Sequence, residues 1–138
     1  MYKTILMTLD ATPTDRTIIK HVKELAKLMQ SRVVLLHVAT GAPAKWRGPD
    51  AAGEEVEKSQ AYLDKVSAEF KALAISADTV LGYGDPVTEI VKWVKKNRCD
   101  LVAMSTHGHQ LLGDLLHGTT AIRVQHSVSV PVLLLRAR

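Results

Sequence analysis

Short apolar runs alternate along this chain with longer segments in which apolar residues recur every three or four positions. The short runs place apolar residues on both sides of the backbone, which is typical of strands covered on both faces. The longer segments have one apolar and one charged face, which is typical of helices that pack on a sheet. The pattern therefore predicts five strands, at residues 2–9, 32–38, 75–81, 100–104 and 131–135.

Residues with strong local preferences mark where the helices between these strands begin. Thr12 or Thr14 can cap the first helix, and Asp85 followed by Pro86 is a typical start for the third. Residues 40–53 hold three glycines and two prolines, which predicts a surface loop. The sequence leaves open whether this loop covers a binding site or only connects two elements. The helices are expected at residues 14–29, 54–74, 86–97 and 119–128.

This regular alternation of strands and helices predicts one doubly wound α/β domain that spans residues 1–138. Its sheet should be parallel, with right-handed crossovers and helices on both faces. In such folds a ligand binds outside the carboxyl ends of the strands, where the direction of winding reverses.

Composition removes several other classes of protein. Apolar residues make up 46% of the chain and charged residues 23%, as in ordinary globular domains. No apolar run approaches the ~20 residues that cross a bilayer, and the opening lacks a signal-peptide pattern, so we expect a cytoplasmic protein that does not bind membranes.

Cys99 is alone, so no internal disulfide is expected. The net charge of +4 is spread over several helices, which argues against nucleic-acid binding but suits a small anionic ligand.

The most informative stretch follows the fourth predicted strand. It reads Ser105-Thr-His-Gly108, then nine residues, then Gly118-Thr119. A glycine lets the backbone approach a phosphate closely, and a helix that begins at Gly118 would offer free N–H groups to an anion. Thr119 and Thr120 add hydroxyl groups. This spacing suggests a phosphate site, although two glycines around a loop also occur in many unrelated proteins.

The same stretch resembles the nucleotide-binding motif of the universal stress protein family, in which Gly, two residues, Gly, nine residues and Gly precede Ser or Thr. Gly108, Gly118 and Thr119 match the motif, while Ser105 stands in place of its first glycine. The resemblance extends along the chain, through the opening YKTILMTLD, the strand segment LLHV and the ending VPVLLL. It implies a five-stranded sheet in the order 3-2-1-4-5 and a homodimer formed through the strand at residues 130–135.

The resemblance also implies a binding site for ATP, ADP or AMP, with Mg²⁺. Asp10 corresponds to an acidic residue near adenine and ribose, Val38 to a residue that contacts adenine, and Met104 and Ser105 to residues beside the ribose. Thr8 and Leu9 stand where the family commonly has proline and a small apolar residue. The residues that correspond to phosphate contacts are Gly108, Gly118, Thr119 and Thr120.

Two further readings concern the histidines and catalysis. His107, His109, His117 and His37 suggest a zinc site, but no cysteine or acidic residue accompanies them at metal-ligand spacing, and we expect no metal centre. His109 and His117 fit either phosphate donors or loop surface. No Walker motif, paired carboxylate or Ser–His–Asp order stands out, so we assign no catalytic residue and expect at most a slow ATPase.

Three functions therefore remain. The first is a stress-response regulatory protein that binds ATP or ADP and changes its partner choice as a nucleotide-dependent switch. The second is a dimeric interaction module whose pocket is vestigial. The third is a hydrolytic enzyme on the same scaffold, because a fold does not fix a function. The glycines at both ends of the predicted phosphate loop favour the first.

Overall fold

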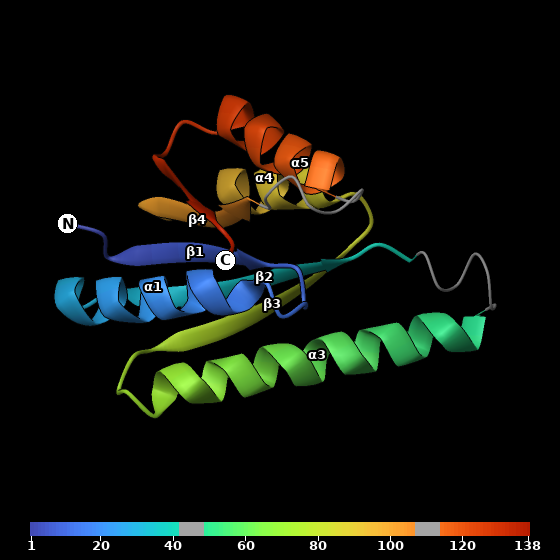
Figure 1. The fold of residues 1–138 in the computed structure, drawn as a ribbon, viewed down its shortest axis with the longest axis horizontal. Helices are drawn as coiled ribbons and strands as arrows, with labels where there is room; N and C mark the ends of the chain where they lie inside the picture. Colours follow the sequence, from blue (N-terminus) through green and yellow to red (C-terminus); the bar gives the residue numbers. More distant parts are fainter. Residues whose placement is uncertain (42–48, 107–113) are drawn as a thin grey trace.

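The computed structural model describes residues 1–41, 49–106 and 114–138, in which strands and helices alternate from end to end (Figure 1). Apolar β-branched runs form the strands, and the amphipathic segments between them form the helices. The elements are β1 (Thr4–Leu9), α1 (Asp15–Met29), β2 (Arg32–Ala39), α3 (Pro49–Lys71), β3 (Ala77–Tyr83), α4 (Pro86–Lys96), β4 (Leu101–Thr106), α5 (Asp114–Ser127) and β5 (Val132–Arg136).

The five strands form one parallel sheet in the order β3-β2-β1-β4-β5, which confirms the predicted fold class. β1 lies at the centre, with Met7 opposite Leu35 of β2 and Ala103 of β4. The chain winds outward from β1 in one direction through β2 and β3, and in the other through β4 and β5. The point at which the winding reverses therefore lies between β1 and β4.

Two apolar cores lie on opposite faces of this sheet, as its buried, non-alternating strands require. α1 and α3 cover one face, and α4 and α5 cover the other (Figure 1). Alternate residues of β1 point to alternate sides, so Ile5 and Met7 join the first core while Leu6 joins the second. All three side chains are fully buried, and each contributes about 2 kcal/mol of transfer free energy.

Several predicted boundaries differ from those in the structure. β3 continues to Tyr83 because β2 pairs with it as far as Ala39 opposite Tyr83, although Gly82 reads as a turn residue. α3 begins at Pro49, inside the predicted loop. For β3, pairing with a distant segment extends the element beyond its local signals.

The predicted start of the last helix is wrong. α5 begins at Asp114, so Gly118 and Thr119 are its fifth and sixth residues and do not form its N-terminus. A glycine inside a helix costs about 1 kcal/mol, which is why the sequence favoured a start after Gly118. The free backbone N–H groups of α5 therefore belong to residues before Gly118.

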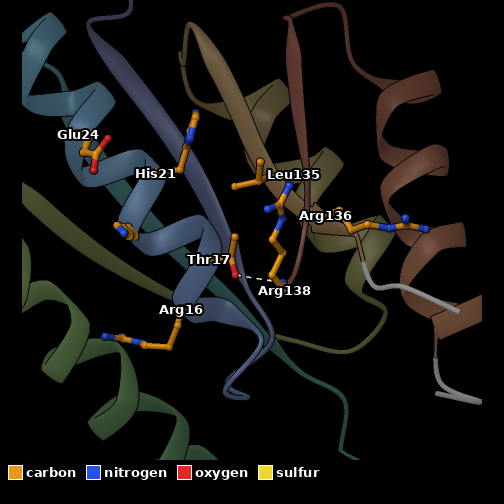
Figure 2. Close-up of a pocket in the computed structure, with 8 residues that line it drawn as sticks. Arg16, Thr17, His21, Glu24, Leu135, Arg136 and Arg138 are labelled. Atoms are coloured by element: carbon orange, nitrogen blue, oxygen red, sulfur yellow. Dashed lines mark hydrogen bonds between the residues drawn. The ribbon is translucent and has the colours of Figure 1, made fainter. Parts of the chain in front are cut away.

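The end of the chain lies beside α1. The backbone N–H of Arg138 donates a hydrogen bond to Thr17 Oγ1 over 3.1 Å, and a cavity of about 530 Å³ lies between α1 and β5 (Figure 2). Several cations surround it, but the guanidinium of Arg16 turns away toward α3, where it binds Glu69. This cavity lies on the face of the sheet that α1 and α3 cover, because α1 and Leu135, which packs against the core on that face, line it.

An ion-pair network joins α1 to α3. Glu69 accepts hydrogen bonds from Arg16 Nη1 at 2.9 Å and Nη2 at 3.1 Å, and from Lys23 Nζ at 2.7 Å. These bonds, those from Arg16 foremost, lower the pKa of Glu69 to about 2 from its usual 4.5. Because the folded-state pKa lies below the unfolded value, the stabilisation is complete above pH 4.5 and is lost as the pH falls toward 2.

We expect Glu69→Gln to lower the free energy of unfolding by about 1 kcal/mol at pH 7, because a partly exposed network is screened by solvent. The difference from wild type should shrink as the pH falls below 4.5. Urea unfolding at several pH values measures it. Glu57→Gln, an exposed residue of the same helix, is the matched control and should change little. A constant difference between wild type and Glu69→Gln down to the lowest pH would contradict this assignment.

Candidate functional site

A cavity of about 410 Å³ lies at the carboxyl ends of β1, β2 and β4, next to the switch point. The strand ends, the first turns of α4 and the middle of α5 enclose it. It is therefore in the place where doubly wound proteins bind ligands. The lining residues are Thr8, Leu9, Asp10, Leu36, His37, Val38, Thr40, Asp85, Pro86, Val87, Ile90, Met104, Thr120 and Arg123.

The cavity brings together half of the predicted site residues. Asp10, Val38, Met104 and Thr120 come from four different elements and all line it. Their convergence follows from the parallel sheet, whose carboxyl ends lie along one edge.

Ser105 does not line this cavity, although it directly follows Met104. Its Oγ is buried and has no hydrogen-bond partner among residues 1–41, 49–106 and 114–138. Gly108 lies outside the described residues, as do His107 and His109. Of Gly118 and Thr119 the structure gives only the backbone, within α5. The predicted contacts of these residues with phosphate stay predictions.

Sequence reasoning missed two charged residues at this cavity. Asp85 caps α4, accepting a hydrogen bond from the N–H of Thr88 over 2.9 Å as predicted, but it also lines the cavity. Arg123 lies on α5 one turn after Thr120, on the same face. The i, i+3 spacing from Thr120 was the available signal for Arg123.

Asp85 and Arg123 influence each other across the cavity. Hydrogen bonds from Thr88 lower the pKa of Asp85 below its usual range, and the positive charge of Arg123 adds to the effect. Asp85 is therefore ionised at neutral pH. The lining of the cavity therefore carries both signs of charge, from Asp10 and Asp85 and from Arg123.

A buried carboxylate holds the loop that carries Asp10. Asp15, which is only 1% exposed, accepts hydrogen bonds from the N–H of Asp10 over 3.0 Å and from the N–H of Ala11 over 2.9 Å. Tyr62 of α3 donates its hydroxyl to the same carboxylate over 2.7 Å. Ala11 has a φ of 63°, in the left-handed region that costs a non-glycine residue about 1 kcal/mol. Asp15 thus fixes a strained turn beneath Asp10.

Burial raises the pKa of Asp15, although the hydrogen bonds from the Asp10 N–H and from Tyr62 oppose it. Burial also raises the pKa of Tyr62, and the neighbouring Asp15 carboxylate raises it further. The hydroxyl of Tyr62 is therefore neutral, and can donate, at neutral pH. On the neighbouring strand β2, His37 Nδ1 donates to the carbonyl oxygen of Leu9 over 2.8 Å, which fixes the imidazole at the end of β2.

The described residues offer a ligand cavity with an apolar wall and a polar mouth. Val38 and Met104 are 7% and 4% exposed and supply the apolar side, while Asp10, Thr120 and Arg123 supply the polar side. No group of three or more His, Cys, Asp or Glu residues in the described part of the chain could hold a metal ion. In that part, no helix is long and apolar enough to span a bilayer.

This fold is that of a doubly wound α/β protein with a cavity at its switch point. The family model of the universal stress protein family matches residues 1–136, and the chain belongs to that family, as its motifs predicted. Two relatives share its whole length. Universal stress protein MJ0577 of Methanocaldococcus jannaschii is 26% identical, with 100% of this chain and 97% of that protein covered. A universal stress protein of Thermus aquaticus is 28% identical, with 99% of this chain and 100% of that protein covered.

Solved structures have the same fold. That of MJ0577 superposes with a TM-score of 0.85 at 26% identity, covering 100% of this chain and 98% of the other. A universal stress protein in complex with cAMP superposes with a TM-score of 0.77 at 17% identity, covering 99% of each chain. One from Archaeoglobus fulgidus in complex with dAMP gives 0.70 at 15%, covering 96% of this chain and 97% of the other.

Proposed function

We propose that this protein binds an adenine nucleotide in the cavity at the carboxyl ends of β1, β2 and β4, and that it acts as a nucleotide-dependent regulatory protein. The observation that carries the proposal is the convergence of Asp10, Val38, Met104 and Thr120 on this one cavity. These residues were assigned to nucleotide contacts from sequence alone, and they lie far apart along the chain.

The lining residues suit the parts of such a ligand. The cavity volume of about 410 Å³ falls within the range of roughly 300–1,000 Å³ that small-molecule sites occupy. Val38 and Met104 offer an apolar surface to the faces of a purine, and the carboxylate of Asp10 can accept hydrogen bonds from ribose hydroxyls. Thr120 and Arg123 are the donors on α5, where phosphate groups would lie.

Relatives of the same fold support this proposal. A universal stress protein has been solved with cAMP and another with dAMP, and both ligands contain adenine, a pentose and one phosphate. ATP, ADP and AMP share adenine and ribose. With a di- or triphosphate, Mg²⁺ would add charge near the phosphates, and the carboxylate of Asp10 or of Asp85, which both line the cavity, would hold it through water.

The direct test has two steps. The purified protein is denatured with acid and any released nucleotide is identified by mass spectrometry, and the emptied protein is then titrated with ATP, ADP and AMP by calorimetry. We expect binding of at least one adenine nucleotide. Neither released nucleotide nor heat with any of the three would exclude the proposal and leave an interaction module with a vestigial pocket. Phosphate release from Mg-ATP, followed over hours, distinguishes a binding protein from a slow ATPase.

We further propose that the protein is a homodimer formed through β5. This strand ends the sheet, and its outer backbone edge pairs with no strand in the described part of the chain. Val132, Leu133, Leu134 and Leu135 are all only half-buried. An apolar edge strand of this kind is prone to pair with another chain, so a second copy would satisfy its backbone groups.

Leu134→Lys should shift the protein from dimer to monomer, because a charge at the pairing edge would have to be desolvated. Size-exclusion chromatography with light scattering measures the mass, and far-UV circular dichroism verifies the fold. Tyr83→Lys, at the exposed end of the opposite edge strand β3, is the matched control and should remain dimeric. A folded Leu134→Lys variant with an unchanged dimer mass would place the interface elsewhere.

A further inference from the structure

A second concave surface lies between α4 and α5, outside the proposed nucleotide site. The two helices pack side by side over one face of the sheet (Figure 1). The groove between them has a volume of about 620 Å³. We refer to it as the α4–α5 groove, and the residues that line it are Val87, Thr88, Val91, Lys92, Lys95, Lys96 and Ser127.

The charge of this groove has one sign only. Lys92, Lys95 and Lys96 line it, and no carboxylate of the described side chains does. Because Lys92 and Lys96 are four residues apart and Lys95 lies between them, all three project from neighbouring positions on α4. The three ion pairs that the structure records involve none of them. Glu89 lies one turn earlier on the same helix but does not line the groove. It lies against β3, because a Cβ added at Gly82 would be 3.5 Å from the Cβ of Glu89.

The floor of the groove is apolar. Val87 is 8% exposed, and Val91 is half-buried against the core formed by α4, α5 and the sheet. An isolated lysine cluster on a convex helix is usually a solvated surface. Here the lysines border a groove with an apolar floor. An amphipathic helical segment of a protein binds such a groove through its apolar face, and the lysines add positive charge beside that contact.

We propose that the α4–α5 groove is a docking surface for an acidic amphipathic helix of a partner protein. Apolar side chains of that helix would cover Val87 and Val91, and its carboxylates would pair with Lys92, Lys95 and Lys96. The match of charge supplies orientation and a fast association rate, and the apolar contact supplies much of the affinity. The surface does not depend on nucleotide binding, although Val87 lines both the groove and the nucleotide cavity.

Other anionic partners fit this surface less well. Single-stranded nucleic acids are held by aromatic side chains on which bases stack, and among the described residues no aromatic side chain lines the groove. Trp93 packs against the core instead. A second copy of the chain would have to present its own acidic segment.

The test uses a fluorescent amphipathic peptide of about four helical turns with a leucine stripe flanked by glutamates. Anisotropy measures its binding, and amide chemical-shift changes locate it on the protein. We expect shifts at Val87, Val91, Lys92 and Ser127, and binding at least about tenfold weaker for the double variant Lys92→Glu/Lys95→Glu. A charge-reversed peptide with lysines in place of glutamates should bind this variant in preference to the wild type.

The matched control is Lys58→Glu/Lys65→Glu, which makes the same change in net charge on the exposed side of α3 and should bind as the wild type does. Three results would overturn the proposal. The first is that the glutamate–leucine peptide does not bind. The second is that a peptide with serine in place of leucine, an oligonucleotide or anionic vesicles bind the groove as tightly as the glutamate–leucine peptide does. The third is self-association of the wild-type protein that the double variant abolishes, which would assign the groove to a second copy.

Discussion

Arg123→Glu is expected to weaken the binding of ATP by roughly 10- to 100-fold, because one charge-assisted hydrogen bond contributes about 1.5–3 kcal/mol. Arg123 is exposed at the mouth of the cavity on α5, so the change should leave the core intact. A glutamate there also repels both phosphate and Asp85. Calorimetric titration of wild type and variant at the same ionic strength measures the effect.

Adenosine provides an internal control for this experiment because it has no phosphate group. Its affinity should be nearly equal for the wild type and Arg123→Glu, since Val38, Met104 and Asp10 are unchanged. Arg98→Glu makes the same change in net charge at an exposed residue outside the cavity, and should bind ATP as the wild type does. If Arg123→Glu loses affinity for adenosine and for ATP equally, the variant distorts the cavity. If it binds both ligands as tightly as the wild type does, the phosphates lie elsewhere.

Asp15→Ala should lower the free energy of unfolding by about 3 kcal/mol, the largest effect on stability that we expect from a single polar residue. The alanine leaves the N–H groups of Asp10 and Ala11 and the hydroxyl of Tyr62 without their acceptor. Removal of a desolvated carboxylate offsets part of that loss, as the raised pKa of Asp15 indicates. Urea or thermal unfolding measures the change.

Two further variants separate the role of Asp15 in the loop from its role in the core. Tyr62→Phe removes one hydrogen bond but leaves both loop contacts. It should therefore lower the free energy of unfolding by about 1 kcal/mol and preserve nucleotide affinity.

Asp15→Asn keeps the volume of the side chain, but its amide oxygen can accept from only one of the two loop N–H groups. It should therefore weaken nucleotide binding as well as stability. Adding Ala11→Gly to Asp15→Asn should restore part of that affinity, because glycine adopts the positive φ of residue 11 without strain. Equal affinity of wild type and Asp15→Asn would show that Asp10 needs no such support.

Much of the fold could be predicted because its signals are local and repeated. Continuous apolar runs such as Val33–Val38 can only be buried on both faces, and the right-handed crossovers that join parallel strands leave few topologies. Asp85 and Pro86 specified the start of α4 through their own hydrogen-bonding and backbone preferences. Asp10 and Val38 could be placed at the cavity because each lies at the carboxyl end of a predicted strand, whereas Met104 and Thr120 were assigned through the resemblance to the family.

Other features depend on partners far away in the sequence, and local preferences do not contain them. The extension of β3 to Tyr83 follows from its pairing with β2, and α5 begins at Asp114 despite the internal glycine at Gly118. Asp15 reads as an ordinary first-turn residue, but the fold buries it beneath the Asp10 loop and adds Tyr62 from 47 positions away.

The sequence by itself determined the order and type of the elements, the edge of the sheet at which the cavity lies, and the family. Those properties follow from the periodicity of apolar residues and from short motifs, which act over a few residues. Only the tertiary structure decided which charges meet at that edge and which lysines border a hollow, because the electrostatic environment of a side chain depends on everything packed around it.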